Sequence, residues 1–194
     1  MKPNPEEDKR TAEAELLAIR CQLGEAQAFD QLVERWHGPL WRFVVRMMQD
    51  PAAAEELMQD IWLRILRGLP GLRNPAKLVS WMFSIARRAV MDRLRRRYAE
   101  ADWVSLEDEP VDPVSDSATG QELALTQLES LEQLHDAVAE LALAERETVT
   151  LFYLHELSLQ EVAEVLEIPV GTVKSRLHRA RTRLRRALLS EGDR

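Results

Sequence analysis

The stretch SLQEVAEVLEIPVGTVKSRLHRAR, at 158–181, decides the fold of the C-terminal half of this chain. Ser158 followed three residues later by Glu161 is the pattern of a capping box, which predicts the start of a short helix. Residues 167–170 predict a tight turn, and Gly171 with Thr172 opens a second helix. The stretch therefore predicts a helix-turn-helix. The apolar side chains expected to pack its two helices together are Val162, Ala163, Val165, Leu166, Val173 and Leu177.

The second of these helices carries a strongly basic face. Seven of the residues from Lys174 to Arg186 are Lys or Arg and none is acidic, so their charges repel one another unless an anion neutralises them. A helix of this width fits the major groove of DNA. We predict that the outward side chains bind DNA and that Arg176 reads a base; an antiparallel helix pair with a solvated basic face is the alternative. The predicted DNA-binding residues are Thr172, Lys174, Ser175, Arg176, His178 and Arg179.

Helical patterns cover the rest of the chain as well, and no strand pattern competes with them. Apolar residues recur every three or four positions over 29–47, where His37-Gly38-Pro39 is a candidate kink. A second helix is predicted to begin with Asp50 as its N-cap and Pro51 as its first residue. Turn residues at 68–75 end this helix, and a third helix follows at about 76–98. In the other helical segments, the side chains expected to point into the core are Leu16 to Ile19, Leu57, Met58, Ile61, Trp62, Ile65, Leu66, Leu78, Met82, Ile85, Ala89, Leu94, Leu128, Leu131, Leu134, Val138 and Leu141.

Charge is segregated along the chain in a way that its net charge of -7 hides. Residues 87–97 hold six Arg against one Asp, whereas 98–145 hold 13 acidic residues and no Lys or Arg. Within the acidic part, 103–120 contains two Pro and three Ser with no sustained apolar period, which indicates a linker. Two basic segments therefore flank an acidic middle.

These features together predict the fold class and the domain boundaries. A chain of 194 residues with 45% hydrophobic residues and only 7 Gly is typical of one ordinary or two small globular, helix-rich domains. We predict an all-α protein with two small helical domains at 1–100 and 123–194. An acidic flexible linker at 101–122 joins them, and the C-terminal domain is the helix-turn-helix domain.

The first basic segment differs from the second because aromatic residues precede its arginines. In WMFSIARRAVMDRLRRR, at 81–97, Trp81 and Phe83 lie on the same predicted helix as six arginines. Such a surface can stack on unpaired bases and hold phosphate, which suggests single strands. The alternative is that both aromatics belong to the core and the arginines face solvent. Asp92 is expected to pair structurally with Arg88, Arg95 or Arg96.

Several classes of function are excluded by what the sequence lacks. Cys21 is the single cysteine, so no intrachain disulfide forms, and Cys21, His37, His135 and His155 show no metal-ligand spacing. No Ser-His-Asp set and no glycine-rich phosphate loop occurs, so we expect neither an enzyme nor a cofactor. The polar start MKPNPEEDKR and the lack of a long apolar run predict a cytoplasmic protein without membrane insertion.

The order of these features resembles a bacterial sigma factor of the compact extracytoplasmic-function (ECF, group IV) type over nearly the whole chain. FDQLVERW and LWRFVVRMM are similar to the opening helices of its first domain, and DPAAAEELMQDIWLRIL to its polymerase-binding helix. SWMFSIARRAVMDRLRRR resembles the promoter-melting helix, and LALAERETVTLFYLHELSLQEVAEVLEIPVGTVKSRLHRARTRLRRAL matches the second domain. LuxR-like regulators carry a comparable helix-turn-helix but lack the DPAAAEELMQDIW and WMFSIARR segments.

The resemblance implies a promoter-specificity subunit that binds core RNA polymerase and helps to open promoter DNA. The first domain docks on the clamp helices of the largest subunit and meets the −10 element through the turn at 68–75 and the third helix. The second sits on the flap of the other large subunit and reads the −35 element. A solvated face is the alternative to docking. The implied polymerase-binding residues are Glu56, Gln59, Asp60 and Arg64, and the implied −10 and melting residues are Trp81, Arg87, Arg88 and Arg95.

Three further expectations depend on the resemblance. The family usually carries Asn where this chain has Arg88, so the −10 preference of a relative does not transfer. The acidic linker enters the polymerase's RNA exit path or serves as a solubilising tether. An anti-sigma factor is a further expected partner. A stand-alone regulator of the LuxR sort is the alternative function, and a protein-binding adaptor leaves both basic segments unexplained.

Overall fold

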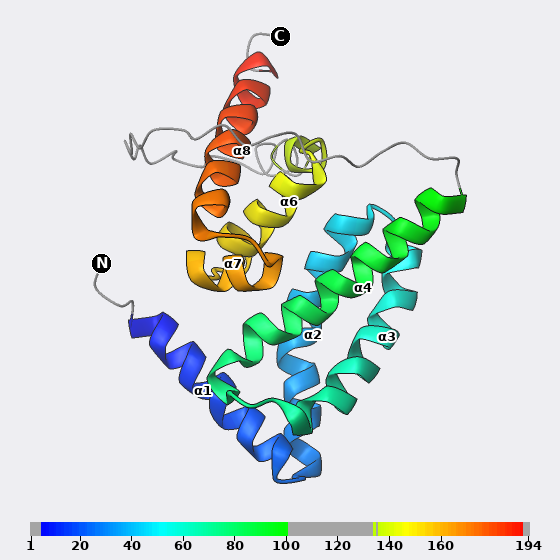
Figure 1. The fold of residues 1–194 in the computed structure, drawn as a ribbon, viewed down its shortest axis with the longest axis vertical. Coiled ribbons are helices and arrows are strands. Elements are labelled where there is room, and N and C mark those ends of the chain that lie inside the picture. Colours follow the sequence, from blue (N-terminus) through cyan, green and yellow to red (C-terminus); the bar gives the residue numbers. More distant parts are fainter. Residues whose placement is uncertain (1–4, 101–133, 135, 192–194) are drawn as a thin grey trace. The chain divides into compact units, whose positions relative to one another are not determined.

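The computed structural model describes residues 5–100, 134 and 136–191, and every regular element among them is a helix. The expected all-α fold class is therefore confirmed for this part of the chain. The chain divides into two compact units, the first built on α1 to α4 and the second mainly on α6 to α8 (Figure 1). The predicted linker at 101–122 and the predicted core residues Leu128 and Leu131 lie outside the described residues.

The first unit consists of four helices and two short 3-10 segments. Helices α2, α3 and α4 pack against one another, and α1 packs against α2, α4 and the 3-10 segments (Figure 1). Asp50 is the N-cap of α3, as predicted, and its side chain accepts a hydrogen bond from Ala53 N at 3.1 Å. The elements are α1 (Pro5–Gln22), α2 (Ala26–Met48), α3 (Pro51–Gly68), η1 (Leu69–Gly71), η2 (Pro75–Lys77) and α4 (Leu78–Glu100).

Helix α2 runs without interruption through Pro39, the candidate kink. A proline inside a helix removes one backbone hydrogen bond. Buried side chains before and after it, Trp36, Leu40 and Phe43, compensate by holding both halves of α2 in the same core. Tertiary packing thus overrides the local breaker.

Nine of the expected core positions within the described residues are not buried. Leu16 and Ile19 of α1 and Leu66 of α3 are exposed. The other six are half-buried: Phe29, Val33, Leu57, Trp62, Ile85 and Leu134. The expectation that Leu16, Ile19 and Leu66 point inward is wrong, because each helix buries a narrower stripe than its apolar content suggests. On α1 that stripe is Ala14, Leu17 and Ala18, and on α3 it is Ala54, Met58, Ile61 and Ile65.

The second unit contains the helix-turn-helix. Ser158 N donates to Glu161 Oε2 at 2.9 Å and Glu161 N donates to Ser158 Oγ at 3.3 Å, so the capping box is present. The turn after α7 places Glu167 at a φ of 57°, the left-handed conformation that ends a helix. The six predicted packing residues Val162, Ala163, Val165, Leu166, Val173 and Leu177 are all buried. The elements are α6 (Leu143–Val149), the π-helical segment η3 (Thr150–Leu154), α7 (Leu159–Leu166) and α8 (Val170–Glu191).

Candidate nucleic-acid interface

Helix α8 presents a polar face at its N-terminal end. Lys174 and His178 are exposed, and Thr172, Ser175 and Arg176 are half-buried. Ser175 Oγ donates to the Thr172 carbonyl oxygen at 3.0 Å, which fixes both residues within the first turns of the helix. The five side chains are close in sequence and lie at the end of α8 that a recognition helix places against base edges.

Arg179, the sixth predicted DNA-binding residue, is oriented differently. Its Nε is buried, and it lies 3.7 Å from Oε1 of Glu145 on α6. One helical turn later, Arg183 Nη1 donates to Glu145 Oε2 at 2.9 Å. The Arg179 side chain is 37% exposed and so points outward only in part, because a buried carboxylate on a neighbouring helix attracts its Nε. Its contact with DNA stays a prediction.

Glu145 is a residue that the sequence reasoning missed. Its side chain is only 5% exposed, and its partner Arg183 lies 38 residues later in the chain. Pairing rules for helices cover three or four positions within a single helix, so this contact has no local signal. Glu145 connects the start of α6 to the middle of the basic helix.

Replacing Arg183 with alanine is expected to destabilise the chain more than replacing Glu145 with glutamine. The first change leaves a buried carboxylate with Arg179 alone, and an underpaired buried charge costs about 1–3 kcal/mol. The second keeps an amide oxygen beside Arg179 and Arg183, and Arg183 is half-exposed and so reaches water. Urea unfolding of both variants followed by circular dichroism measures the difference. Equal losses, or a larger loss for Glu145→Gln, would contradict the burial argument, and Arg185→Ala on an exposed position is the matched control.

The two aromatic residues at the start of α4 have different environments. Phe83 is completely buried, and its ring meets that of Phe43 edge to face with centroids 5.7 Å apart. Trp81 is half-buried. The expectation that both rings belong to a surface for unpaired bases is wrong for Phe83, because Phe83 lies in the core between α2 and α4, and only Trp81 can reach a base.

Trp81 shares a face of α4 with two arginines. Trp81, Arg88 and Arg95 are spaced by seven residues, which is close to two helical turns, so they form one stripe along the helix. Arg88 and Arg95 are exposed, whereas Arg87 lies off this stripe and is half-buried. The structure thus places three of the four predicted −10 residues together.

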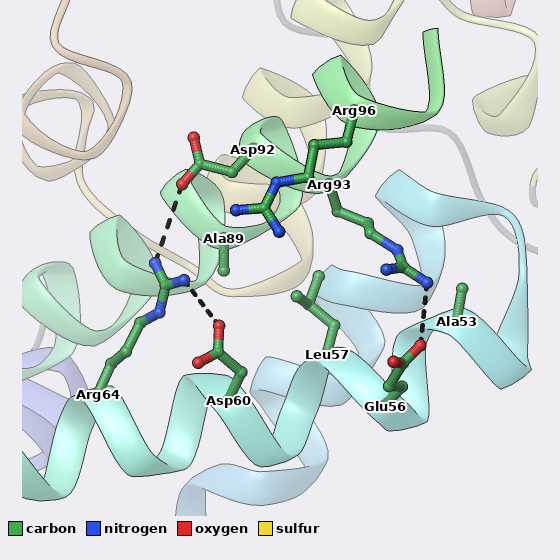
Figure 2. Close-up of a pocket in the computed structure, with 9 residues that line it drawn as sticks. All are labelled: Ala53, Glu56, Leu57, Asp60, Arg64, Ala89, Asp92, Arg93 and Arg96. Atoms are coloured by element: carbon green, nitrogen blue, oxygen red, sulfur yellow. Dashed lines mark hydrogen bonds and ion pairs between the residues drawn. The ribbon is translucent and has the colours of Figure 1, made fainter. Parts of the chain in front are cut away.

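A groove lies between α3 and the C-terminal half of α4 (Figure 2). Arg93 of α4 reaches across it and donates to Glu56 Oε2 at 2.9 Å. Glu56, Asp60 and Arg64, predicted to bind polymerase, line the groove, whereas Gln59 is exposed and does not line it. The groove is lined by Ala53, Glu56, Leu57, Asp60, Arg64, Ala89, Asp92, Arg93 and Arg96.

Arg64 joins the two walls of this groove. Its guanidinium lies 2.7 Å from Asp60 Oδ2 on its own helix and 3.9 Å from Asp92 Oδ2 on α4 (Figure 2). Asp92 also pairs with Arg95 at 3.3 Å, one of the three partners that the sequence offered for it. The face of α3 predicted for protein docking and the basic helix α4 therefore share one network of charges.

Within the described part of the chain, no three His, Cys, Asp or Glu side chains are grouped so that they could bind a metal ion. Burial raises the pKa of the Cys21 thiol above its ordinary value, so this thiol is protonated at neutral pH. No helix among the described residues is long and apolar enough to cross a membrane.

Two family models match successive segments of the chain. Residues 32–100 match the family model Sigma-70 region 2, and residues 131–184 match Sigma-70, region 4. The chain is 35% identical over 177 residues to the ECF RNA polymerase sigma factor SigM of Mycobacterium tuberculosis (strain ATCC 25618 / H37Rv), covering 91% of this chain and 85% of the relative. It is 29% identical over 171 residues to the ECF RNA polymerase sigma factor SigW of Bacillus subtilis (strain 168), covering 85% and 91%.

Two solved structures share the fold. CnrH, in complex with the cytosolic domain of CnrY, superposes with a TM-score of 0.66 at 22% identity, covering 91% of this chain and 97% of that chain. The sigma factor RpoE from Bartonella quintana, in complex with the anti-sigma factor NepR, superposes with a TM-score of 0.66 at 24% identity, covering 84% and 98%. The region 2 and region 4 matches and the identity to curated relatives lead to one conclusion: this chain belongs to the ECF sigma factors, the promoter-directing subunits of RNA polymerase.

Proposed function

We propose that this chain binds core RNA polymerase, directs it to promoters with −35 and −10 elements, and assists the opening of the duplex. The observation that carries the proposal is that one chain has two different surfaces that suit nucleic acid. The polar end of α8 suits the major groove of duplex DNA. The stripe of Trp81, Arg88 and Arg95 on α4 suits unpaired bases, because it combines an aromatic ring with cations.

The division of labour follows the domain boundaries 1–100, 101–122 and 123–194. The matched ranges 32–100 and 131–184 fall within the first and third of these segments, which supports this assignment. The N-terminal domain recognises and melts the −10 element, and the C-terminal domain recognises the −35 element. The acidic linker between them would occupy the polymerase's RNA exit path, and a solubilising tether is the alternative.

Polymerase docking is assigned to the face of α3 that borders the groove. Glu56, Gln59, Asp60 and Arg64 would meet the clamp helices of the largest subunit, and the second domain would meet the flap of the other large subunit. Gln59 is exposed, and the ion pairs of Asp60 and Arg64 hold their side chains at the rim of the groove. A face of this kind is polar and accessible, like the rim of a non-obligate protein interface.

An anti-sigma factor is proposed as the regulatory partner. The similar solved structure of RpoE is a complex with the anti-sigma factor NepR, which supports the proposal for a chain of the same fold. Such a partner would cover the α3 face and compete with core polymerase. Leu63 and Leu66, exposed on α3, offer apolar surface for it.

The chain supplies specificity and the polymerase supplies the chemistry, so we propose no catalytic residue and no cofactor. Its place of action is the cytoplasm, at the nucleoid.

The deciding experiment is run-off transcription from genomic promoter fragments with core polymerase, in the presence and absence of this chain. We expect discrete transcripts only when the chain is added. Transcripts that are identical with and without the chain would contradict the proposal. Inhibition by a protein that co-purifies from the native host, relieved by excess core enzyme, tests the anti-sigma partner in the same assay.

Replacing Trp81 and Arg88 with alanine together is expected to slow promoter opening at least tenfold, with little change in closed-complex binding. Stacking and strand capture act only once bases are exposed, and base stacking is worth about 1–3 kcal/mol per base. Permanganate footprinting of the holoenzyme measures opening, and a gel shift at low temperature measures closed binding. Arg67→Ala, at an exposed position of α3, is the control. Equal losses in both assays would contradict a role in melting.

A further inference from the structure

The turn between α3 and α4, residues 68–75, is held by a side chain from a distant helix. Gln22 is the last residue of α1. Its Nε2 donates to the carbonyl oxygen of Leu69 at 3.1 Å and to that of Leu72 at 2.8 Å, in a part-buried environment. These contacts join residues 47 and 50 positions apart in the sequence.

One amide group thus fixes both ends of the 3-10 segment η1. A primary amide has two N–H hydrogens, and here each goes to a different carbonyl. Leu72 N also donates to the Leu69 carbonyl oxygen at 3.1 Å, so the same two residues are joined through the backbone. A part-buried carbonyl that loses its donor is costly, which makes the amide of Gln22 a strong determinant of the shape of the turn.

The flanks of the turn are fixed as well. Gly68 lies against Trp81, and a Cβ at position 68 would come within 2.8 Å of Trp81 Cζ2. Gly68 has a φ of -86° and a ψ of -24°, which any residue adopts, so glycine is required here for space and not for backbone conformation. On the other side, Asn74 Oδ1 accepts a hydrogen bond from Ala76 N at 3.2 Å and caps η2.

The tip of the turn, in contrast, is open. Pro70, Gly71, Arg73 and Asn74 are exposed, whereas Leu69 is buried. A rigid frame with an exposed polar tip is the arrangement that recognition by a loop requires, because a preorganised loop loses little conformational entropy on binding.

We propose that Gln22 is a positioning residue for −10 recognition: it holds η1 so that the tip of the turn meets the −10 element in one orientation. The inference rests on the proposed function, in which the turn at 68–75 contacts the −10 element. Gln22 itself does not touch DNA. It lies outside the segment 32–100 that matches Sigma-70 region 2, so the family match does not assign it a role.

The test compares Gln22→Glu with Gln27→Glu in the holoenzyme. The first change is isosteric and removes both N–H donors. The second adds the same charge at an exposed position of α2. Run-off transcription is measured on templates that differ only at −10 bases and on templates that differ only at −35 bases, starting from a promoter that the wild-type chain recognises. We expect Gln22→Glu to reduce discrimination among −10 templates at least fivefold and to leave −35 discrimination unchanged, while Gln27→Glu changes neither.

A second variant and a local measurement separate positioning from simple destabilisation. Gly68→Ala disturbs the opposite flank of the same turn and is expected to reduce −10 discrimination as well. Amide hydrogen exchange at Leu72 should accelerate in Gln22→Glu, because Leu72 N is a donor within the held segment. Unchanged −10 discrimination in Gln22→Glu, or equal loss at −10 and −35, would overturn the inference. A wild-type chain that directs polymerase to no promoter would instead contradict the proposed function.

Discussion

Replacing Phe83 with alanine is expected to lower the free energy of unfolding of the chain by about 3–5 kcal/mol, the range for deleting a buried aromatic ring. Phe83 is 0% exposed, and its edge-to-face contact with Phe43 joins α4 to α2. Its loss leaves a cavity in the core that these long helices cannot fill without moving. Urea unfolding monitored by circular dichroism gives the measurement.

Trp81→Ala is the matched comparison, because it also removes an aromatic ring from the start of α4. Trp81 is half-buried, so we expect its removal to cost clearly less stability. The pair of variants therefore distinguishes a core aromatic from a surface aromatic only two positions away. A Phe83→Ala chain as stable as Trp81→Ala would show that the packing between α2 and α4 does not support the fold.

Replacing Arg176 with alanine is expected to weaken binding to the −35 element by about 1–3 kcal/mol and to relax the preference at one base pair. Arg176 lies in the second turn of α8, where a recognition helix contacts base edges. A guanidinium reads guanine through two hydrogen bonds, so its loss removes discrimination as well as affinity. Binding of the holoenzyme to promoters with every substitution in the −35 element measures both.

Lys174→Ala serves as the comparison for Arg176→Ala. Lys174 is exposed, and as a phosphate contact its loss should weaken binding equally for all sequences. It should also reduce the slope of log affinity against log salt by about 1. A uniform loss for Arg176→Ala, without relaxed preference at any base pair, would assign Arg176 to phosphate and not to a base.

Much of the fold was predictable because its signals are local. The Asp50 cap and the Ser158–Glu161 capping box each depend on residues three positions apart, and both are present in the structure. The six packing residues of the helix-turn-helix follow from helical periodicity. In contrast, the exposure of Leu66 depends on which part of α3 its neighbours cover, and periodicity within one helix does not contain that information.

The site was less predictable because its contacts join distant segments. Arg64 with Asp92, Arg93 with Glu56 and Gln22 with Leu72 are separated by 28, 37 and 50 residues. Their pairing depends on how the helices cross. The π-helical segment η3 likewise has no known signal in residue spacing, and its place directly after α6 is a finding of the structure alone.

The ion pair between Arg93 and Glu56 in the groove between α3 and α4 is weak. Glu56 is 71% exposed and Arg93 42%, and solvated ion pairs of this kind contribute only about 0.2–1 kcal/mol each. The carboxylate of Glu56 thus keeps the guanidinium of Arg93 extended across the groove but binds it only weakly. Arg93 can therefore exchange Glu56 for another anionic partner at a cost of no more than about 1 kcal/mol.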